Sequence, residues 1–447
     1  EAMFENGVQE NLRLRVASVV YYPEVSGTFG NYESATHYSY DIHGNVKEQV
    51  QDVPGLAVVE QNQKTTQYEY ELISGNVEKV MYQKDELDEF THEYEYDELN
   101  RLTEVFTSRD DIHWTREAHY HYYDYGPLAR TELGQYQVQG QDFAYTINGW
   151  LKTMNGSTLD KTRDIGGDGN SGYLTNNTSV HSGVARDINA YTIGYFEGDY
   201  TAIGTSLMEM SSVLGDDFHT ANNNLYNGNI AHLVTSIYGM TTLGTVYSYD
   251  QLQRLTEMTA FKNTNTDNTW TGIGSTQDYY NAYTYDRNGN ILTLQRNGTA
   301  STNSLLMDDF TYDYTTVGIA LSNRLDRVRD TGLDDGSSQE GDIKSGMNIG
   351  NFRYDKLGQL TEDASEEIQS IEWRKGDKKM ASLTRTASSS LPDLEFKYNP
   401  FGLRILKIEK TKSSPGFYAP AEEWNYTYYT YDANGQTMAV YLSLIHI

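Results

Sequence analysis

The chain has 447 residues, no cysteine and a formal net charge of −29 at pH 7, from 34 lysines and arginines against 63 aspartates and glutamates. This acidity argues against binding to nucleic acid or to an anionic membrane surface, because both require basic patches. The absence of cysteine excludes disulfide bonds, thiolate catalysis and thiolate metal sites, and no apolar run is long enough for a transmembrane helix.

The first predicted elements are a strand and a hairpin. Apolar positions alternate and then run together in residues 12–22, as in a partly buried strand. In the hairpin that follows, Tyr38 and Tyr40 share one face of a strand, and Asp41 opens a tight turn. The carboxylate of Asp41 can accept backbone N–H groups in that turn, and Gly44 provides the positive φ that it needs.

This hairpin recurs along the chain, in about ten copies, which is typical of a repeat architecture. Two clear copies carry Asn100 and Gln253 in place of the turn glycine. The tyrosine, aspartate and glycine positions of the clear copies after the first are Tyr96 and Asp97; Tyr249 and Asp250; Tyr285, Asp286 and Gly289; Tyr354, Asp355 and Gly358; Tyr431, Asp432 and Gly435. Weaker copies start at Tyr68, Tyr122, Phe143, Phe310 and Phe396. The 38 tyrosines suit half-exposed β surfaces, because the ring packs while the hydroxyl finds a polar group.

Two stretches depart from the repeats. Residues 155–224 are rich in Asn, Gly, Ser and Thr and are interpreted as an irregular insertion, within which residues 205–210 could form a short helix or strand. Residues 442–447 resemble translated sequencing-adapter read-through, so we expect a non-native tail there and a repeat segment that spans residues 1–441.

Several residue groups could carry chemistry, and each has a structural alternative that we favour. The repeated aspartates occupy a fixed place before a turn, whereas a glycosidase needs one pair of carboxylates across a cleft. Residues 168–172 have oxygen ligands at alternate positions, as in a calcium loop, but Ser179 stands where the closing Glu is expected. His119 and His121 share a strand face and could bind zinc, but no third ligand has the usual spacing.

The tryptophans could stack against sugars or pack between hairpins, and we favour packing because they do not cluster; they are Trp114, Trp150, Trp270, Trp373 and Trp424. There is no phosphate-binding loop motif and no G-x-S-x-G nucleophile motif. The sequence therefore predicts no catalytic residue, no cofactor and no metal site, and assigns the repeated Tyr, Asp and Gly residues to the structure of the turns.

The pattern aromatic-x-Tyr-Asp-x-x-Gly-Asn/Arg-Leu/Ile resembles the tyrosine–aspartate (YD) repeat of RHS proteins, which is also found in teneurins and in the B/C components of insecticidal toxin complexes. The stretches Tyr145-Thr146-Ile147-Asn148-Gly149-Trp150-Leu151 and Leu225-Tyr226-Asn227-Gly228-Asn229-Ile230 resemble RHS proteins of Bacteroidetes-type bacteria. The resemblance implies a hollow shell around a C-terminal toxin, which an adjacent core releases by aspartate-dependent self-cleavage. We expect this chain to be a fragment that ends before that core.

We therefore predict an all-β fold in which YD-repeat hairpins form a long, spiralling antiparallel sheet, part of a hollow shell. The predicted function is a structural, non-enzymatic shell segment of an RHS-type polymorphic toxin, secreted or at the cell surface and used in bacterial competition. Its predicted partner is the C-terminal effector of the same polypeptide, with secretion machinery or cell-surface glycans as further candidates. The alternatives are an adhesin or carbohydrate-binding repeat module and, third, a hydrolase with its site in the insertion.

Overall fold

The computed structural model describes residues 4, 7–22, 32–59, 61–159, 164–169, 181, 183–201, 224–263, 270–272, 277–299, 306–317, 320–332 and 347–443. The chain forms two compact units. Unit 1 combines residues 1–115 with residues 350–447, and unit 2 comprises residues 116–349.

The N-terminal segment of unit 1 is an antiparallel meander, in which each strand pairs with the next along the chain. It contains β1 (Ser18–Tyr21), β2 (Ser34–Tyr40), β3 (Val46–Asp52), the 3-10 helix η1 (Pro54–Val59), β4 (Gln63–Tyr70), β5 (Val77–Tyr82), β6 (Phe90–Tyr96) and β7 (Leu102–Ser108).

The C-terminal segment of unit 1 is a second antiparallel sheet. Its strands are β21 (Phe352–Tyr354), β22 (Leu360–Asp363), β23 (Ile368–Trp373), β24 (Met380–Arg385), β25 (Asp393–Tyr398), β26 (Arg404–Lys410), β29 (Asn425–Tyr431) and β30 (Thr437–Ser443). A small hairpin of β27 (Lys412–Ser414) and β28 (Phe417–Tyr418) and the 3-10 helix η4 (Ala421–Glu423) lie between β26 and β29.

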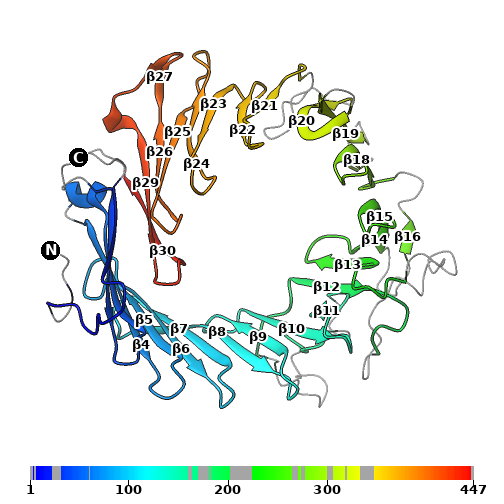
Figure 1. The fold of residues 1–447 in the computed structure, drawn as a ribbon. Helices are drawn as coiled ribbons and strands as arrows, with labels where there is room; N and C mark the ends of the chain where they lie inside the picture. The colour runs from blue at the N-terminus through cyan, green and yellow to red at the C-terminus, as the bar shows by residue number, and fades with distance from the viewer. Residues whose placement is uncertain are drawn as a thin grey trace. The chain divides into compact units, whose positions relative to one another are not determined.

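The last hairpin of the chain, β29–β30, packs against β3 to β5 of the N-terminal segment (Figure 1). The Gln49 amide donates a hydrogen bond of 2.8 Å to the carbonyl of Tyr431. The Tyr82 hydroxyl contacts the hydroxyls of Thr430 at 2.9 Å and Tyr441 at 2.7 Å. Unit 1 is thus closed by side chains that are more than 340 residues apart in sequence.

One buried cation supports this contact. The Lys64 side chain is fully buried, and its ammonium lies 2.8 Å from a carboxylate oxygen of Asp88 and 4.4 Å from the centre of the Tyr441 ring. The Tyr441 hydroxyl donates a hydrogen bond to the same Asp88 carboxylate. The ion pair with Asp88 and the cation–π contact with Tyr441 compensate for much of the hydration that Lys64 loses on burial.

Unit 2 continues the antiparallel hairpins. Its strands are β8 (Trp114–Tyr122, whose first two residues belong to unit 1), β9 (Leu128–Leu133), β10 (Gln139–Tyr145), β11 (Leu151–Met154), β12 (Asn189–Gly194), β13 (His232–Ile237), β14 (Leu243–Tyr249), β15 (Leu255–Asn263), β16 (Trp270–Gly272), β17 (Asn281–Tyr285), β18 (Ile291–Asn297), β19 (Leu306–Val317) and β20 (Ala320–Asp330). Burial alternates along β10 and β13, as expected for strands that pack through one face.

Every clear copy of the repeat bends in the same way. The strand register shifts at the tyrosine just before the turn, for example between Glu95 and Tyr96 and between Ser248 and Tyr249. The turn then requires a residue in the left-handed region: φ is 60° at Asn100, 65° at Gln253 and 103° at Gly44. The prediction that Asn100 and Gln253 take the place of the turn glycine is confirmed.

The all-β fold built from successive antiparallel hairpins is confirmed, whereas the strand predicted for residues 12–22 is too long. Only Ser18–Tyr21 forms β1, and Leu14, inside the predicted strand, has a positive φ of 58°, which breaks an extended strand. Side chains bind the backbone there instead: the Gln9 amide donates to the carbonyls of Ala17 and Tyr38.

The stretch interpreted as an irregular insertion, residues 155–224, contributes a sheet strand that the sequence analysis missed. β12 lies inside it and pairs with β11 on one side and β13 on the other. Residues 205–210 lie outside the described residues. At the end of the chain, Leu442 and Ser443 extend β30, and residues 444–447 lie outside the described residues. No helix in the described part of the chain has the length and apolarity to span a membrane.

Candidate functional site

The repeat turns are held by their aspartates. Oδ1 of Asp97 accepts the backbone N–H groups of Leu99 and Arg101, both at 2.9 Å, and Oδ2 accepts Nε of Arg101 at 2.7 Å. These bonds, the backbone N–H of Arg101 first, hold the pKa of the Asp97 carboxyl below its usual range. The carboxylate is therefore ionised at neutral pH, and both of its oxygens accept hydrogen bonds within the turn.

The other predicted aspartates also accept backbone N–H groups of their own turns. Oδ1 of Asp250 accepts the N–H groups of Leu252 at 2.8 Å and Arg254 at 2.9 Å. The corresponding donors are Gly44 and Asn45 for Asp41, Asn288 and Asn290 for Asp286, Leu357 and Gln359 for Asp355, and Asn434 and Gln436 for Asp432. Gly289, Gly358 and Gly435 occupy the positive-φ place in these turns, as Gly44 does. Each aspartate thus caps a different turn.

In many of the hairpins, the tyrosine just before the turn links its hairpin to the preceding one, a role that the sequence analysis did not foresee. The hydroxyl of Tyr96 donates to the carbonyl of Val77 at 2.9 Å, and that of Tyr285 donates to the carbonyl of Leu255 at 2.6 Å. We call this contact the tyrosine lock. It also joins Tyr40 to Val16, Tyr70 to Val46, Tyr195 to Leu151, Tyr249 to Ile230, Tyr314 to Ile291, Tyr398 to Met380 and Tyr431 to Arg404.

A signal for the lock was present in the sequence. The first aromatic position of the repeat accepts Tyr or Phe, as Phe352 and Phe396 show, but the second is tyrosine in these copies too, at Tyr354 and Tyr398. Phenylalanine would pack equally well at the second position, so the use of tyrosine there indicates that its hydroxyl makes a hydrogen bond.

The tryptophans with described side chains pack or bind within the sheets. Nε1 of Trp373 donates to the carbonyl of Leu360 at 2.7 Å, which is a tryptophan version of the lock. Nε1 of Trp424 donates to Ala419, the ring of Trp150 lies 5.0 Å from that of Tyr195, and the Lys79 ammonium lies 4.8 Å from the ring of Trp114. The side chain of Trp270 lies outside the described residues.

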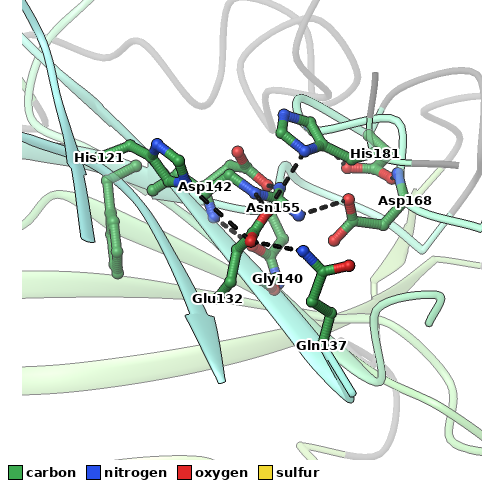
Figure 2. A network of polar contacts seen from close by, with 12 residues as sticks. His121, Glu132, Gln137, Gly140, Asp142, Asn155, Asp168 and His181 are labelled. Atoms are coloured by element: carbon green, nitrogen blue, oxygen red, sulfur yellow. Dashed lines mark hydrogen bonds and ion pairs between the residues drawn. The ribbon is translucent and has the colours of Figure 1, made fainter. Parts of the chain in front are cut away.

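Unit 2 contains a buried polar cluster centred on Arg130 of β9. Figure 2 labels its acidic partners Glu132, Asp142 and Asp168. The Arg130 guanidinium donates to Asp142, to Asp168 at 2.8 Å and to Glu132 at 3.2 Å. Asp168 is the first residue of the stretch that resembles a calcium loop, and the structure pairs it with this arginine. Residues 170–180 lie outside the described part of the chain.

Acidic groups outnumber this arginine. Burial raises the pKa of Asp142 above its usual value and that of Asp168 to about 6. Burial, followed by the charge of Asp164, raises the pKa of Asp187 to about 8. The Oδ2 atom of Asp168 and the Oδ1 atom of Asp187 are buried without a hydrogen-bond partner among the described residues. The raised pKa values show that several carboxyl groups crowd around one arginine, and at neutral pH Asp187 is mostly protonated.

The two histidines predicted to share a strand face do so on β8, and the fold brings a carboxylate to them. His119 faces Glu132 directly in the antiparallel register of β8 and β9. Oε2 of Glu132 lies 3.9 Å from Nδ1 of His119 and 4.0 Å from Nε2 of His121. Nδ1 of His181 lies 3.3 Å from the other carboxylate oxygen (Figure 2). Sequence spacing alone did not reveal Glu132, because it comes from the neighbouring strand.

Comparison with known proteins identifies a similar fold among solved structures, but no family by sequence. No protein-family model and no curated protein matches the chain. The crystal structure of TcdB2-TccC3-Cdc42 aligns with a TM-score of 0.53 at 15% identity, over 90% of this chain and 17% of the other. That of TcdB2-TccC3 aligns with a TM-score of 0.54 at 13% identity, over 92% of this chain and 18% of the other.

This chain has the fold of the aligned part of the TcdB2-TccC3 structures. The chain spans less than a fifth of the length of the chains that it matches. A third structure, the Photorhabdus luminescens Tc holotoxin pore, aligns with a TM-score of 0.43 at 13% identity, over 93% of this chain and 19% of the other.

Proposed function

We propose that this chain is a segment of the shell of an RHS-type polymorphic toxin, built from YD repeats of the Bacteroidetes type. The observation that carries the proposal is the fold likeness to TcdB2-TccC3 over 90–92% of the chain at only 13–15% identity. The repeated tyrosine locks and aspartate caps support the proposal, because they are formed by the tyrosine and the aspartate of the YD pattern.

The geometry suits a wall rather than an active site. Each lock fixes a hairpin to the one before it, and each cap fixes the turn, so a long sheet can be built from short hairpins without disulfide bonds or metals at the turns. The turn carboxylates of Asp97 and Asp250 already accept several hydrogen bonds, so they are poor candidates for catalysis. In this proposal the chain has no enzymatic activity of its own.

The enclosed partner in this proposal is the C-terminal effector of the same polypeptide, and the protein acts after secretion or at the cell surface. A wall rich in tyrosine offers rings and hydroxyls but little continuous aliphatic surface. Such a wall could hold a partly folded chain without binding one sequence tightly.

The test uses the full-length gene, including the regions before and after this segment. We expect its effector region to resist a protease inside the intact protein and to be cut rapidly when it is expressed alone. Equal cutting rates in the two forms would overturn the proposal. The adhesin alternative would gain support if, in addition, the protein bound specific sugars on a glycan array.

A further inference from the structure

The strongest unassigned feature of the structure lies on β8 and β9 in unit 2, where nitrogen and oxygen ligands converge. One donor atom from each of His119, His121 and Glu132 lies within 4.8 Å of the others. The two imidazole rings are 4.0 Å apart, and Nε2 of His121 is buried without a hydrogen-bond partner among the described residues. Two imidazoles and one carboxylate form a ligand set that zinc accepts.

We propose that His119, His121 and Glu132 bind a Zn²⁺ ion between β8 and β9, with the fourth coordination position left to water. Zinc–nitrogen and zinc–oxygen distances of about 2.0–2.2 Å require tetrahedral ligands about 3.3–3.6 Å apart. The ligand atoms here are 3.9 and 4.0 Å from Oε2 of Glu132, so small side-chain rotations would close the site.

The strands fix the three ligands rigidly. His119 and Glu132 are directly opposed across the β8–β9 ladder, and His121 lies two residues further along the same face. Gln137 donates to Oε2 of Glu132 at 2.8 Å and Arg130 donates to Oε1 at 3.2 Å, so the carboxylate is oriented from outside the site. Hydrogen bonds to a ligand in this manner are typical of metal sites in proteins.

The charge around the site favours a cation despite the presence of Arg130. That arginine is shared among Glu132, Asp142 and Asp168, so one positive charge faces three acidic groups. A divalent ion would reduce the excess of negative charge in the cluster.

Zinc is distinguished from the hard cations by the ligand types. Imidazole suits zinc, cobalt, nickel and copper, whereas calcium and magnesium prefer oxygen ligands throughout. Binding would add a cross-link to two strands that are already paired by their ladder. This proposal stands apart from the shell function, since it depends only on the local geometry of unit 2.

The test is equilibrium dialysis of the 447-residue chain, stripped of metal, against Zn²⁺, followed by metal analysis. We expect about one zinc ion per chain in the wild type and a loss of affinity of about a hundredfold or more in His121→Asn and in His119→Asn. Co²⁺ should give the visible absorption of a tetrahedral site in the wild type and lose it in both variants. Ca²⁺ and Mg²⁺ should not compete with zinc.

The matched control is His113→Asn. His113 is largely exposed and lies 2.6 Å from the carboxylate of Asp110, so it tests whether any histidine beside an aspartate gives the same signal. Because the side chain of His121 is 41% exposed, its substitution should leave the circular dichroism spectrum of the metal-free protein unchanged. The proposal is overturned if the wild type binds no zinc, or if folded His119→Asn and His121→Asn bind it as tightly as His113→Asn.

Discussion

Replacing Tyr249 with phenylalanine tests the tyrosine lock with a single-atom change. The substitution keeps the ring and removes the hydroxyl, which donates to the carbonyl of Ile230 at 2.9 Å. A hydrogen bond of this kind contributes about 0.5–1.5 kcal/mol, and a carbonyl left without a donor moves the cost toward the upper end. We therefore expect Tyr249→Phe to lower the free energy of unfolding by about 1 kcal/mol.

The locks of unit 2 use separate acceptors, so their effects should add. Tyr285 and Tyr314 donate to the carbonyls of Leu255 and Ile291, which are distinct from that of Ile230. The triple variant Tyr249→Phe, Tyr285→Phe, Tyr314→Phe should then lose about 3 kcal/mol. Such a loss is a large fraction of the stability of an ordinary domain.

The assay is urea unfolding followed by circular dichroism, with hydrogen exchange of the β13–β15 amides as a local readout. A lower urea midpoint at unchanged slope would indicate lost stability without a change in the surface that unfolding exposes. The matched control is Tyr283→Phe, two residues from Tyr285 on β17, since the Tyr283 hydroxyl makes no hydrogen bond within the described residues. If Tyr249→Phe unfolds at the same urea concentration as Tyr283→Phe, the lock does not stabilise the repeat.

Three further predictions concern other contacts. Asp97→Ala should lower the urea midpoint more than Asp97→Asn, because an amide oxygen can still accept the turn N–H groups of Leu99 and Arg101. As a control, Glu98→Ala, at an exposed position of the same turn, should leave the urea midpoint unchanged. The folded-state pKa of Asp187, about 8, lies above its unfolded value, so the stability that its proton contributes at low pH is lost as the pH rises through about 8. The thermal midpoint measured between pH 5 and 9 should show this fall, and Asp187→Asn should flatten it. Tyr441→Phe removes the hydroxyl that joins Tyr82 and Asp88, and it should cost about 1–2 kcal/mol and speed hydrogen exchange in β29 and β30; unchanged exchange there would show that the contact is not stabilising.

The hairpin architecture could be predicted from the sequence because its determinants are local. Tyr-x-Tyr alternation, a capping aspartate and a residue tolerant of positive φ all lie within a few positions of one another, and the turns of Asp97 and Asp250 formed as expected. The strand predicted for residues 12–22 was too long because Leu14 adopts a positive φ, which no alternation of apolar residues signals.

The contacts between distant strands could not be predicted in the same way. Glu132 reaches His119 through the register of β8 and β9, and Arg130 meets Asp168 although 38 residues separate them. β12 was missed because it is a single strand between polar stretches rather than half of a recognisable hairpin. Such pairings depend on how strands align, and one sequence gives little information about that alignment.

The contact between the two ends of the chain in unit 1 has a consequence for the time course of folding. Gln49 and Tyr431, which are hydrogen-bonded, are separated by 382 residues. At a synthesis rate of about 5–20 residues per second, the ribosome needs roughly 20–80 s to produce the second after the first. Throughout that interval the faces of β3 to β5 that later receive β29 and β30 are uncovered, and all of unit 2 is translated before they can be closed. Until the last hairpin is made, the newly synthesised N-terminal strands should therefore need either a chaperone or an aggregation rate that is slower than synthesis of the rest of the chain.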